Sequence, residues 1–232
     1  MDEKKEIGDI LFGIKRKWDN FWYHYKVAFI FGVLILAFLI FAVTQCVMKE
    51  KGDANVAYIG WQEFGVEAYN DFQTALSEIL AEDLNGDEKI KIDFSNFSYM
   101  TSSQLEIASA QGKIINIQDL LNVQTQINLE LISTNILIYF LDPKVYEELA
   151  SPGIFMDLED SLGYTPDNAN DIYSIRLGSL PCWSYYPGLN NLPADTVIAI
   201  RELRLSEENN EKILALYERN LKMFKKIIDF KY

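Results

Sequence analysis

"NILIYFLD", residues 135–142, is the stretch that decides the fold. Its six central side chains are apolar or aromatic without polar alternation, which is typical of a strand buried on both faces of a sheet. Asp142 and Pro143 follow, and an N-cap residue before a proline at the first helical position predicts the start of a helix. We expect this helix to reach Ala150 and to stop at "SPG". The stretch therefore predicts a strand-to-helix unit of an α/β fold.

The same alternation continues on both sides of this unit. Apolar runs predict further strands at "NVAYIG" (55–60), "IKIDF" (90–94), "IYSIRLGSL" (172–180) and "TVIAIRELR" (196–204). Apolar residues at helical spacing predict helices over 64–81, from Ile117, and after an N-cap at Ser206. Strands that alternate with helices indicate a largely parallel sheet. We predict a single three-layer, sandwich-like α/β domain, preceded by one transmembrane helix.

Two segments of this domain are less regular. Residues 95–116 fit neither a helix nor a strand, and "PCWSYYPGLNNLP" (181–193) is expected to be a loop because it holds three prolines. The helix that begins at Ile117 is expected to bury one side, which consists of Ile117, Leu120, Leu121, Gln124, Ile127 and Leu131.

An apolar segment near the N-terminus predicts the membrane helix. Val27 to Val43 has no polar side chain, and the run extends to Met48. At about 1.5 Å per residue, 22 residues span roughly 33 Å, enough for a hydrocarbon core of about 30 Å. A cleaved signal would have a shorter apolar part and a small-x-small site. Cleavage or lipidation at Cys46 stays an alternative, although Gln45 fits a lipoprotein signal poorly.

Flanking charges predict the orientation of this helix. Lys15, Arg16, Lys17 and Lys26 precede it, which favours a cytoplasmic N-terminus, and the aromatic cluster over 18–25 fits a membrane interface. We therefore predict four parts: a cytoplasmic juxtamembrane segment (1–26), the transmembrane helix in contact with the lipid bilayer (27–48), a linker (49–54) and an extracellular α/β domain (55–232).

Charge and composition exclude several classes of function. The net charge is −13, and residues 47–232 hold 29 of the 34 acidic residues but 15 of the 21 basic ones. Such an acidic domain repels phosphate backbones, so we expect no nucleic-acid partner. The single histidine is His24, which rules out Ser-His-Asp or Cys-His catalysis in the domain. No Gly-rich phosphate loop is present, and Cys182 is expected to be a small packed side chain.

One turn resembles the start of a calcium loop. In "DLNGDEKIKIDF" (83–94), Asp83, Asn85 and Asp87 occupy positions 1, 3 and 5 of such a loop. Lys89 can offer its backbone carbonyl at position 7. Position 6 is Glu88 instead of glycine and position 12 is Phe94 instead of glutamate, and Asp93, one place early, can replace that ligand only if the backbone differs. The alternative is a polar turn built around Asn-Gly. We expect no cofactor, and calcium is the one candidate.

Candidate ligand contacts come from two places. The rings of Trp183, Tyr185 and Tyr186 can stack on a sugar or peptide if exposed, or else cover the core. In an open α/β sheet, a cleft lies beyond the carboxyl ends of the strands. This rule points to Trp61, Asn96 and Asp142.

Several phrases also carry a family resemblance: "NFWYHYK" (20–26), "NVAYIG", "DLNGDEKIKIDF", "NILIYFLD" with "VYEEL" (145–149), "MDLEDSLG" (156–163) and "LPADTVIAI" (192–200). The chain resembles a group of uncharacterised single-pass envelope proteins of Gram-positive bacteria, whose outer domains are similar to one lobe of type 2 extracellular solute-binding proteins. The resemblance implies an α/β lobe outside the cytoplasm and transfers no binding residue. In that group the turn usually has glycine where Glu88 stands here.

These observations favour a membrane-anchored, extracytoplasmic, non-catalytic module, solute-binding-protein-like, that binds a protein partner or a small ligand at the cell surface. A binder predicts an apolar or aromatic cleft with few ionisable groups. A carboxylate-dependent envelope hydrolase is an alternative, which predicts two acids that converge in a pocket. A structural subunit of a membrane assembly is a third, which predicts an apolar surface patch.

Overall fold

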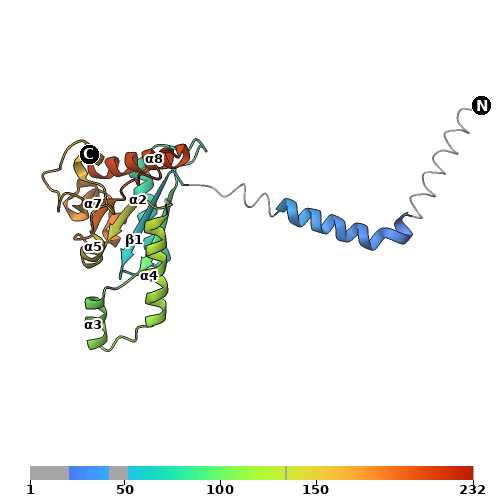
Figure 1. The fold of residues 1–232 in the computed structure, drawn as a ribbon, viewed down its shortest axis with the longest axis horizontal. Coiled ribbons are helices and arrows are strands. Elements are labelled where there is room, and N and C mark those ends of the chain that lie inside the picture. Colours follow the sequence, from blue (N-terminus) through green and yellow to red (C-terminus); the bar gives the residue numbers. More distant parts are fainter. Residues whose placement is uncertain (1–20, 42–51, 134, 232) are drawn as a thin grey trace, which may run out of the picture. The chain divides into compact units, whose positions relative to one another are not determined.

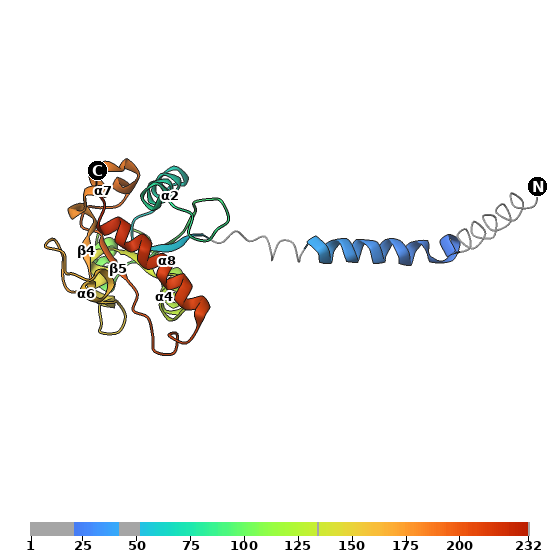
Figure 2. The ribbon, with the colours of Figure 1, turned by 90° about the horizontal axis from the view of Figure 1, so that it is seen from above.

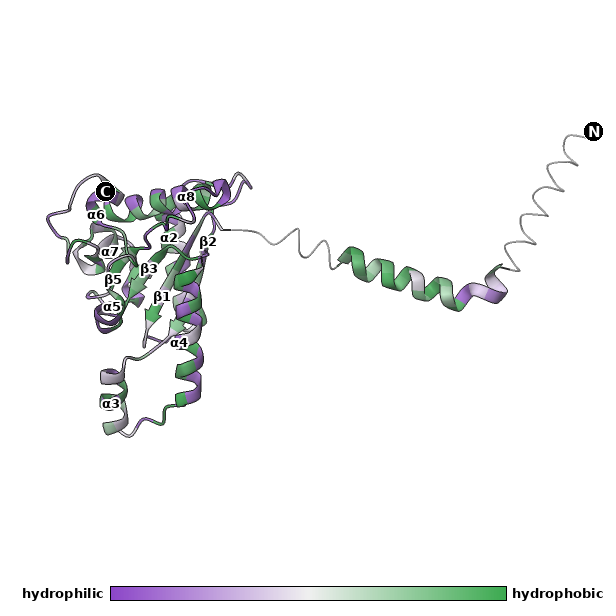
Figure 3. Cartoon of the chain, viewed as in Figure 1, coloured by the Kyte–Doolittle hydropathy of each residue, from purple (hydrophilic) through white to green (hydrophobic). Residues whose placement is uncertain are grey.

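The structure, a computed structural model, describes residues 21–41, 52–133 and 135–231. The chain divides into two compact units, Met1–Glu50 and Lys51–Tyr232. In the first unit, the helix Phe21–Phe41 has a mean hydropathy of 2.2 and is long and apolar enough to cross a membrane, a property that a signal sequence shares. Its described part starts at Phe21, before the predicted start at Val27, and Figure 3 shows most of this helix as hydrophobic. Residues 1–20 of the predicted cytoplasmic segment, and 42–51 with Cys46, lie outside the described residues.

The second unit is built on one five-stranded sheet with the order β2-β1-β3-β5-β4. β1 pairs in parallel with both β2 and β3, whereas β5 runs antiparallel to β3 and β4. Four strands therefore share one direction and β5 opposes them, which confirms a mixed α/β domain with a largely parallel sheet. The strands are β1 (Ala54–Gly60), β2 (Ile92–Ser98), β3 (Ile138–Leu141), β4 (Ile175–Arg176) and β5 (Val197–Ile200).

The central strands are apolar on both faces because both faces are covered. In β3, Ile138 and Phe140 belong to one apolar cluster, and Tyr139 and Leu141 belong to a second. All four are buried, as the continuous apolar run predicts. The side chains of β1 and β5 alternate between the same two clusters. Strand periodicity thus assigns each residue to one of two separate cores.

Helices contribute to each cluster (Figures 1 and 2). Buried residues of α2 (Val66–Leu80) and α8 (Glu211–Ile228) belong to the first, together with residues of α6 (Leu158–Leu162), η1 (Leu177–Ser179), α7 (Pro181–Tyr185) and η2 (Pro187–Asn191). Those of α4 (Ile117–Ile132) and α5 (Pro143–Leu149) belong to the second. Figure 1 shows α3 (Ser102–Ala110) and one end of α4 extending past the carboxyl end of β1.

Several local predictions are confirmed. The strand at 55–60, the helix over 64–81 and the helix after Asp142 all form. The Asp142 carboxylate accepts a hydrogen bond from the Lys144 backbone N–H at 2.9 Å, the N-cap contact that its position before Pro143 predicts.

Other boundaries were wrong. The last helix begins at Glu211 with Asn210 as its cap, because Glu207 pairs with Arg201 in the preceding loop. The predicted loop over 181–193 contains α7 and η2, the strand predicted at 172–180 shrinks to β4, and β2 begins two residues after Ile90. The predicted linker residue Asp53 is fully buried, and its carboxylate accepts hydrogen bonds from the backbone N–H groups of Leu84, Asn85 and Lys91.

The predicted buried side of α4 was only partly right, since Ile127 and Leu131 of the predicted set pack on the sheet. Ile127 is the buried residue of this helix, and Val123 and Leu131 pack partly against the second cluster. Ile117 and Leu121 are instead 56% and 52% exposed. The helix therefore packs on the sheet through a narrower face than its apolar content suggests.

Candidate functional site

Trp61 lies directly after β1, at the carboxyl end of the sheet, and is 48% exposed. The Lys113 ammonium lies over its ring, 5.2 Å from the ring centroid. This distance suits a cation–π interaction, which holds the segment after α3 against the strand end. An indole ring at a strand terminus, with only one face occupied by a cation, is a platform on which a flat or apolar group can stack.

A cleft forms between Trp61 and α3. A smaller part of it, about 160 Å³, is lined by Trp61, Met100, Gln104, Ile107, Ala108, Gln111 and Lys113. A wider hollow of about 740 Å³ shares Trp61, Met100 and Lys113 and continues to the start of α4. Glu63 and Asp119 add two carboxylates to the lining of this wider hollow. The lining of the smaller part thus combines apolar side chains with two amides and one ammonium, and contains no carboxylate.

Hydrogen bonds fix α3 at this position. Thr101 caps the helix, and it forms a capping box with Gln104, whose side chain accepts the Thr101 backbone N–H at 3.0 Å. The Gln104 amide also donates to the Asp142 carboxylate at 3.0 Å. Asp142 is only 8% exposed, so this contact joins α3 to the end of β3 in a partly dry environment. The two chain segments, α3 and the end of β3, are therefore tied together beside the cleft.

Close packing also holds the ends of β1 and β3 together beside the cleft. A Cβ atom on Gly60 would approach the Cβ of Asp142 to 2.9 Å and would overlap the Tyr58 hydroxyl, so the strand ends meet only because residue 60 is glycine. Burial raises the pKa of the Tyr58 phenol far above its ordinary value; a hydrogen bond with the Gln62 backbone opposes the shift, and the Asp142 charge adds to it. The phenol therefore stays neutral at physiological pH and acts as a packing group.

The predicted site residues fall in different places. Trp61 and Asp142 both lie at the carboxyl ends of adjacent strands, and Asp142 reaches the cleft through Gln104. Asn96 is exposed within β2, two residues before that strand ends, and does not line the cleft. The residues that sequence reasoning missed, Met100 and Gln104 to Lys113, belong to the segment left unassigned. The Thr101-x-x-Gln104 capping box was the available signal for α3.

The aromatic segment 183–186 packs elsewhere. Trp183 and Tyr186 contact the first apolar cluster, and the rings of Tyr185 and Tyr186 each lie 5.4 Å from the ring of Phe230. Tyr185 is 52% exposed. These contacts are those of side chains that cover the edge of a core. Cys182, in the same helix, is fully buried, and burial raises the pKa of its thiol to about 12, as expected for a packed side chain.

The calcium-like turn is held by its own hydrogen bonds. The Asp83 carboxylate accepts backbone N–H groups from Asn85, Gly86 and Glu88 at 2.6–3.0 Å. Glu88 adopts a positive φ of 65°, the conformation for which glycine is usual. Asp93 accepts from the Gly52 backbone instead and lies 3.6 Å from the Lys91 ammonium. Among the described residues, no group of three or more His, Cys, Asp or Glu is arranged to hold a metal ion.

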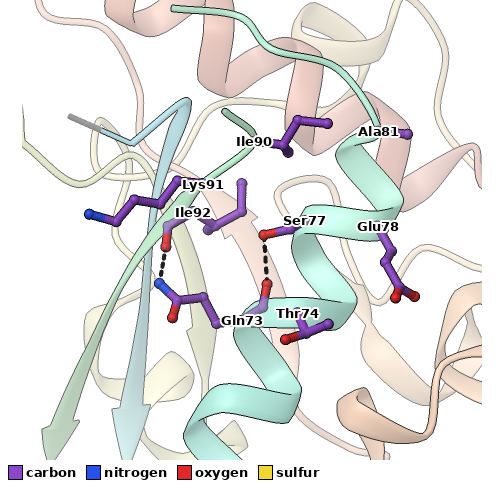
Figure 4. Close-up of a pocket in the computed structure, with 8 residues that line it drawn as sticks. All are labelled: Gln73, Thr74, Ser77, Glu78, Ala81, Ile90, Lys91 and Ile92. Carbon is purple, nitrogen blue, oxygen red and sulfur yellow. Dashed lines mark hydrogen bonds between the residues drawn. The ribbon is translucent and has the colours of Figure 1, made fainter. Parts of the chain in front are cut away.

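An open groove of about 640 Å³ lies between α2 and the start of β2 (Figure 4). In Figure 4 the Gln73 amide donates to the Ile92 carbonyl, and the Ser77 hydroxyl donates to the Gln73 carbonyl at 2.9 Å. The Tyr69 hydroxyl donates to the Phe94 carbonyl at 2.6 Å. Gln73 and Tyr69 thus satisfy carbonyls of the edge strand β2, which protects this part of the edge from pairing with other chains. The groove therefore belongs to the part of α2 that covers the edge of the sheet.

Carboxylates gather in a further cavity of about 480 Å³. Asp157, Asp160, Glu202 and Glu208 line it together with two tyrosines, Tyr173 and Tyr217, and no basic residue. The Oδ1 atom of Asp157 is buried there and has no hydrogen-bond partner in the described part of the chain. The four acidic residues come from three separate segments of the chain, so no sequence motif predicts the cavity.

No protein family, no curated protein and no solved structure matches this chain.

Proposed function

We propose that this chain is a membrane-anchored extracytoplasmic module, without catalytic activity, that binds a ligand in the cleft between Trp61 and α3. The observation that carries the proposal is the composition of the cleft: a half-exposed indole, apolar side chains and a single ammonium, at the carboxyl end of a largely parallel sheet. Open α/β sheets hold ligands at this edge. The smaller part of the cleft is lined by no carboxylate that could act as a general acid or base.

The chemistry of the lining defines the class of ligand. Trp61 and Ile107 favour a flat or apolar group, and Lys113 favours a carboxylate or another anion at the mouth of the cleft. The amides of Gln104 and Gln111 can satisfy a few polar atoms. A free amino acid or a peptide with an aromatic or aliphatic side chain fits this combination, and so does the corresponding segment of a protein partner.

The membrane anchor and the extracytoplasmic location of the domain belong to the same proposal. The helix Phe21–Phe41 is long enough to span the bilayer, and the basic residues before it favour a cytoplasmic N-terminus. The two apolar clusters support the three-layer arrangement. The resemblance to one lobe of a solute-binding protein is part of the same proposal. Protease added to intact cells should then digest residues 52–232. Protection of these residues in intact cells, with digestion only after lysis, would contradict the topology.

A thermal-shift screen of the full chain in detergent tests the binding function. Amino acids, short peptides, sugars and calcium are compared, because a ligand that prefers the native state raises its stability. Each hit is repeated with Trp61→Ala and with Tyr185→Ala, an aromatic control of similar exposure (52% against 48%). We expect stabilisation that Trp61→Ala abolishes and Tyr185→Ala retains. Hits that survive Trp61→Ala would place the ligand outside the cleft.

Two other functions have an observation in their favour. The acid-lined cavity around Asp157 is where a carboxylate-dependent hydrolase would act. The exposed apolar residues of α4 are what a structural subunit of an assembly would present. The cleft favours the binding module over the hydrolase because its aromatic platform and single ammonium suit recognition.

A further inference from the structure

Strand β2 forms one edge of the sheet, and side chains of α2 cap only its first half. The Gln73 amide donates to the Ile92 carbonyl (Figure 4), and the Tyr69 hydroxyl donates to the Phe94 carbonyl. Uncapped, both carbonyls would be open to a strand from another chain. Within the described residues, no side chain caps the backbone of β2 after Phe94 in this way. The second half of the edge is therefore open.

In this open half, the backbone groups of Asn96 and Ser98 point away from the sheet. The Tyr99 backbone N–H donates to the Gly60 carbonyl of β1 at 2.8 Å, so residue 99 turns its N–H toward β1. The direction of the backbone groups alternates along a strand of a parallel pair, so those of Asn96 and Ser98 point to the free edge, as the two capped carbonyls do. Both residues are exposed. The free edge thus presents two N–H and two C=O groups to solvent.

The open edge leads into the cleft beside Trp61. Ser98 pairs with Gly60, the last residue of β1, and Trp61 follows Gly60 in the chain. Ser98 and Trp61 both line the wider hollow of about 740 Å³. A strand rises about 3.3 Å per residue, so a chain that pairs with Asn96 and Ser98 reaches this hollow within one or two further residues. Main-chain contacts at the edge and side-chain contacts in the cleft are therefore continuous.

We propose that β2 receives an extended peptide as an additional strand, which pairs with Asn96 and Ser98 and whose next residues enter the cleft beside Trp61. This inference rests on the proposed binding function and selects a peptide among its ligands. The alternating donors and acceptors of the edge match a peptide main chain, whereas a free amino acid is too short to pair with both residues and reach Trp61. A second copy is disfavoured, because each copy carries a net charge of −13.

A scan with N-methylated peptides tests this pairing. A synthetic library of random heptapeptides, acetylated and amidated, is selected on the full chain in detergent, and each enriched peptide is remade with one N-methyl group at each position in turn. Alternate residues of an added strand bond to the edge, so N-methylation should weaken binding about tenfold or more at every second position. A scan without this period of two would overturn the inference. So would a library without enriched peptides, and if free amino acids still bind, the proposed function survives that result.

Proline substitutions test the same contact from the side of the protein. Asn96→Pro and Ser98→Pro each remove an outward N–H, and these N–H groups do not bond to β1, so the pairing of β1 with β2 is kept. Asn96→Ala and Ser98→Ala are the controls, because they keep the N–H. The proline variants should bind the enriched peptides about tenfold more weakly or worse, and the alanine variants like the wild type. Melting curves show that each variant is folded, and the N-methyl scan decides if a proline variant is not. Folded proline variants with unchanged affinity would contradict the inference.

Discussion

The side-chain amide of Gln104 donates a hydrogen bond of 3.0 Å to the carboxylate of Asp142. The two residues are 38 positions apart, one in the first turn of α3 and the other at the end of β3. Asp142 uses the same oxygen to cap α5. One carboxylate thus aligns two helices at the carboxyl edge of the sheet, and the cleft beside Trp61 depends on where it holds α3.

Replacement of Gln104 by Ala should loosen the cleft. The variant loses the contact to Asp142 and half of the capping box, so we expect a loss of about 1–2 kcal/mol in the free energy of unfolding. Hydrogen exchange of the α3 amides should accelerate, while that of the β3 amides should not. Gln111→Ala is the control, because Gln111 lines the same cleft at the far end of α3. Equal effects of the two variants would show that the tie is unimportant.

Gly60→Ala should destabilise the protein through overpacking. The added methyl group would collide with the Tyr58 hydroxyl and approach the Cβ of Asp142 to 2.9 Å, which typically costs about 1–3 kcal/mol. Gly65→Ala is the matched control, because a Cβ atom there meets nothing within 4 Å. Urea unfolding of the full chain in detergent measures both. A Gly60→Ala variant as stable as Gly65→Ala would refute the close approach of the strand ends.

The buried pair Arg201–Glu207 should make stability depend on acidity. The two side chains are 2.8 Å apart and almost fully buried, and the Nε and Nη1 atoms of Arg201 have no hydrogen-bond partner in the described chain. Burial by itself would raise the pKa of Glu207, but hydrogen bonds from Arg201 and from the Arg204 backbone outweigh it and hold the pKa below its ordinary value. The contribution of ionised Glu207 to the free energy of unfolding is therefore complete above the pKa of about 4.3 that a glutamate has in the unfolded chain. This contribution is lost as the pH falls through the lower pKa of Glu207 in the folded protein.

Glu207→Ala should remove this dependence and cost about 3 kcal/mol at neutral pH, because it leaves the Arg201 guanidinium buried without a partner. The double variant Arg201→Met, Glu207→Leu should recover most of the loss, since no buried charge remains. Unfolding free energies between pH 7 and pH 3 test both statements. A steep acid transition that persists unchanged in Glu207→Ala would assign it to other carboxylates.

The turn at Asp83 should contribute to stability through its hydrogen bonds. Asp83→Ala removes the acceptor of three backbone N–H groups. We expect a small loss in the free energy of unfolding, because water can replace part of these hydrogen bonds at a turn that faces solvent. Added calcium should leave the melting temperature of the wild type unchanged, since Asp93 points to other partners. A calcium-dependent rise that Asp83→Ala abolishes would establish the metal site instead.

Sequence patterns predicted those helices and strands that form because of residues within the same short segment of the chain. The continuous apolar run over 135–142 predicted a strand with two buried faces, and Asp142 before Pro143 predicted the helix that follows. The start of α8 was misplaced because Ser206 and Asn210 are both good N-cap residues. The choice depends on the pairing of Glu207 with Arg201, a contact that N-cap preferences do not include. Likewise, Asp53 looks like a linker residue until the turn at residues 84–91 is placed around it.

The candidate site was only partly predictable for the same reason. The position of Trp61 and Asp142 follows from the rule for parallel sheets, so sequence reasoning found both. The other wall of the cleft comes from α3, which has few apolar residues and no strong periodicity. Helix α4 has apolar residues on two opposite faces. Periodicity alone therefore could not separate the residues that pack on the sheet from the exposed residues Ile117 and Leu121.

Fluorine NMR of the full chain labelled with 5-fluorotryptophan tests the binding cleft most directly. The chain contains four tryptophans, and Trp61→Phe identifies the resonance of Trp61. We predict that ligands from the thermal-shift screen move or broaden the Trp61 resonance and leave that of Trp183 in place. A ligand that shifts Trp183 alone, or stabilising ligands that leave the Trp61 resonance unmoved, would contradict the assignment of the cleft as the binding site.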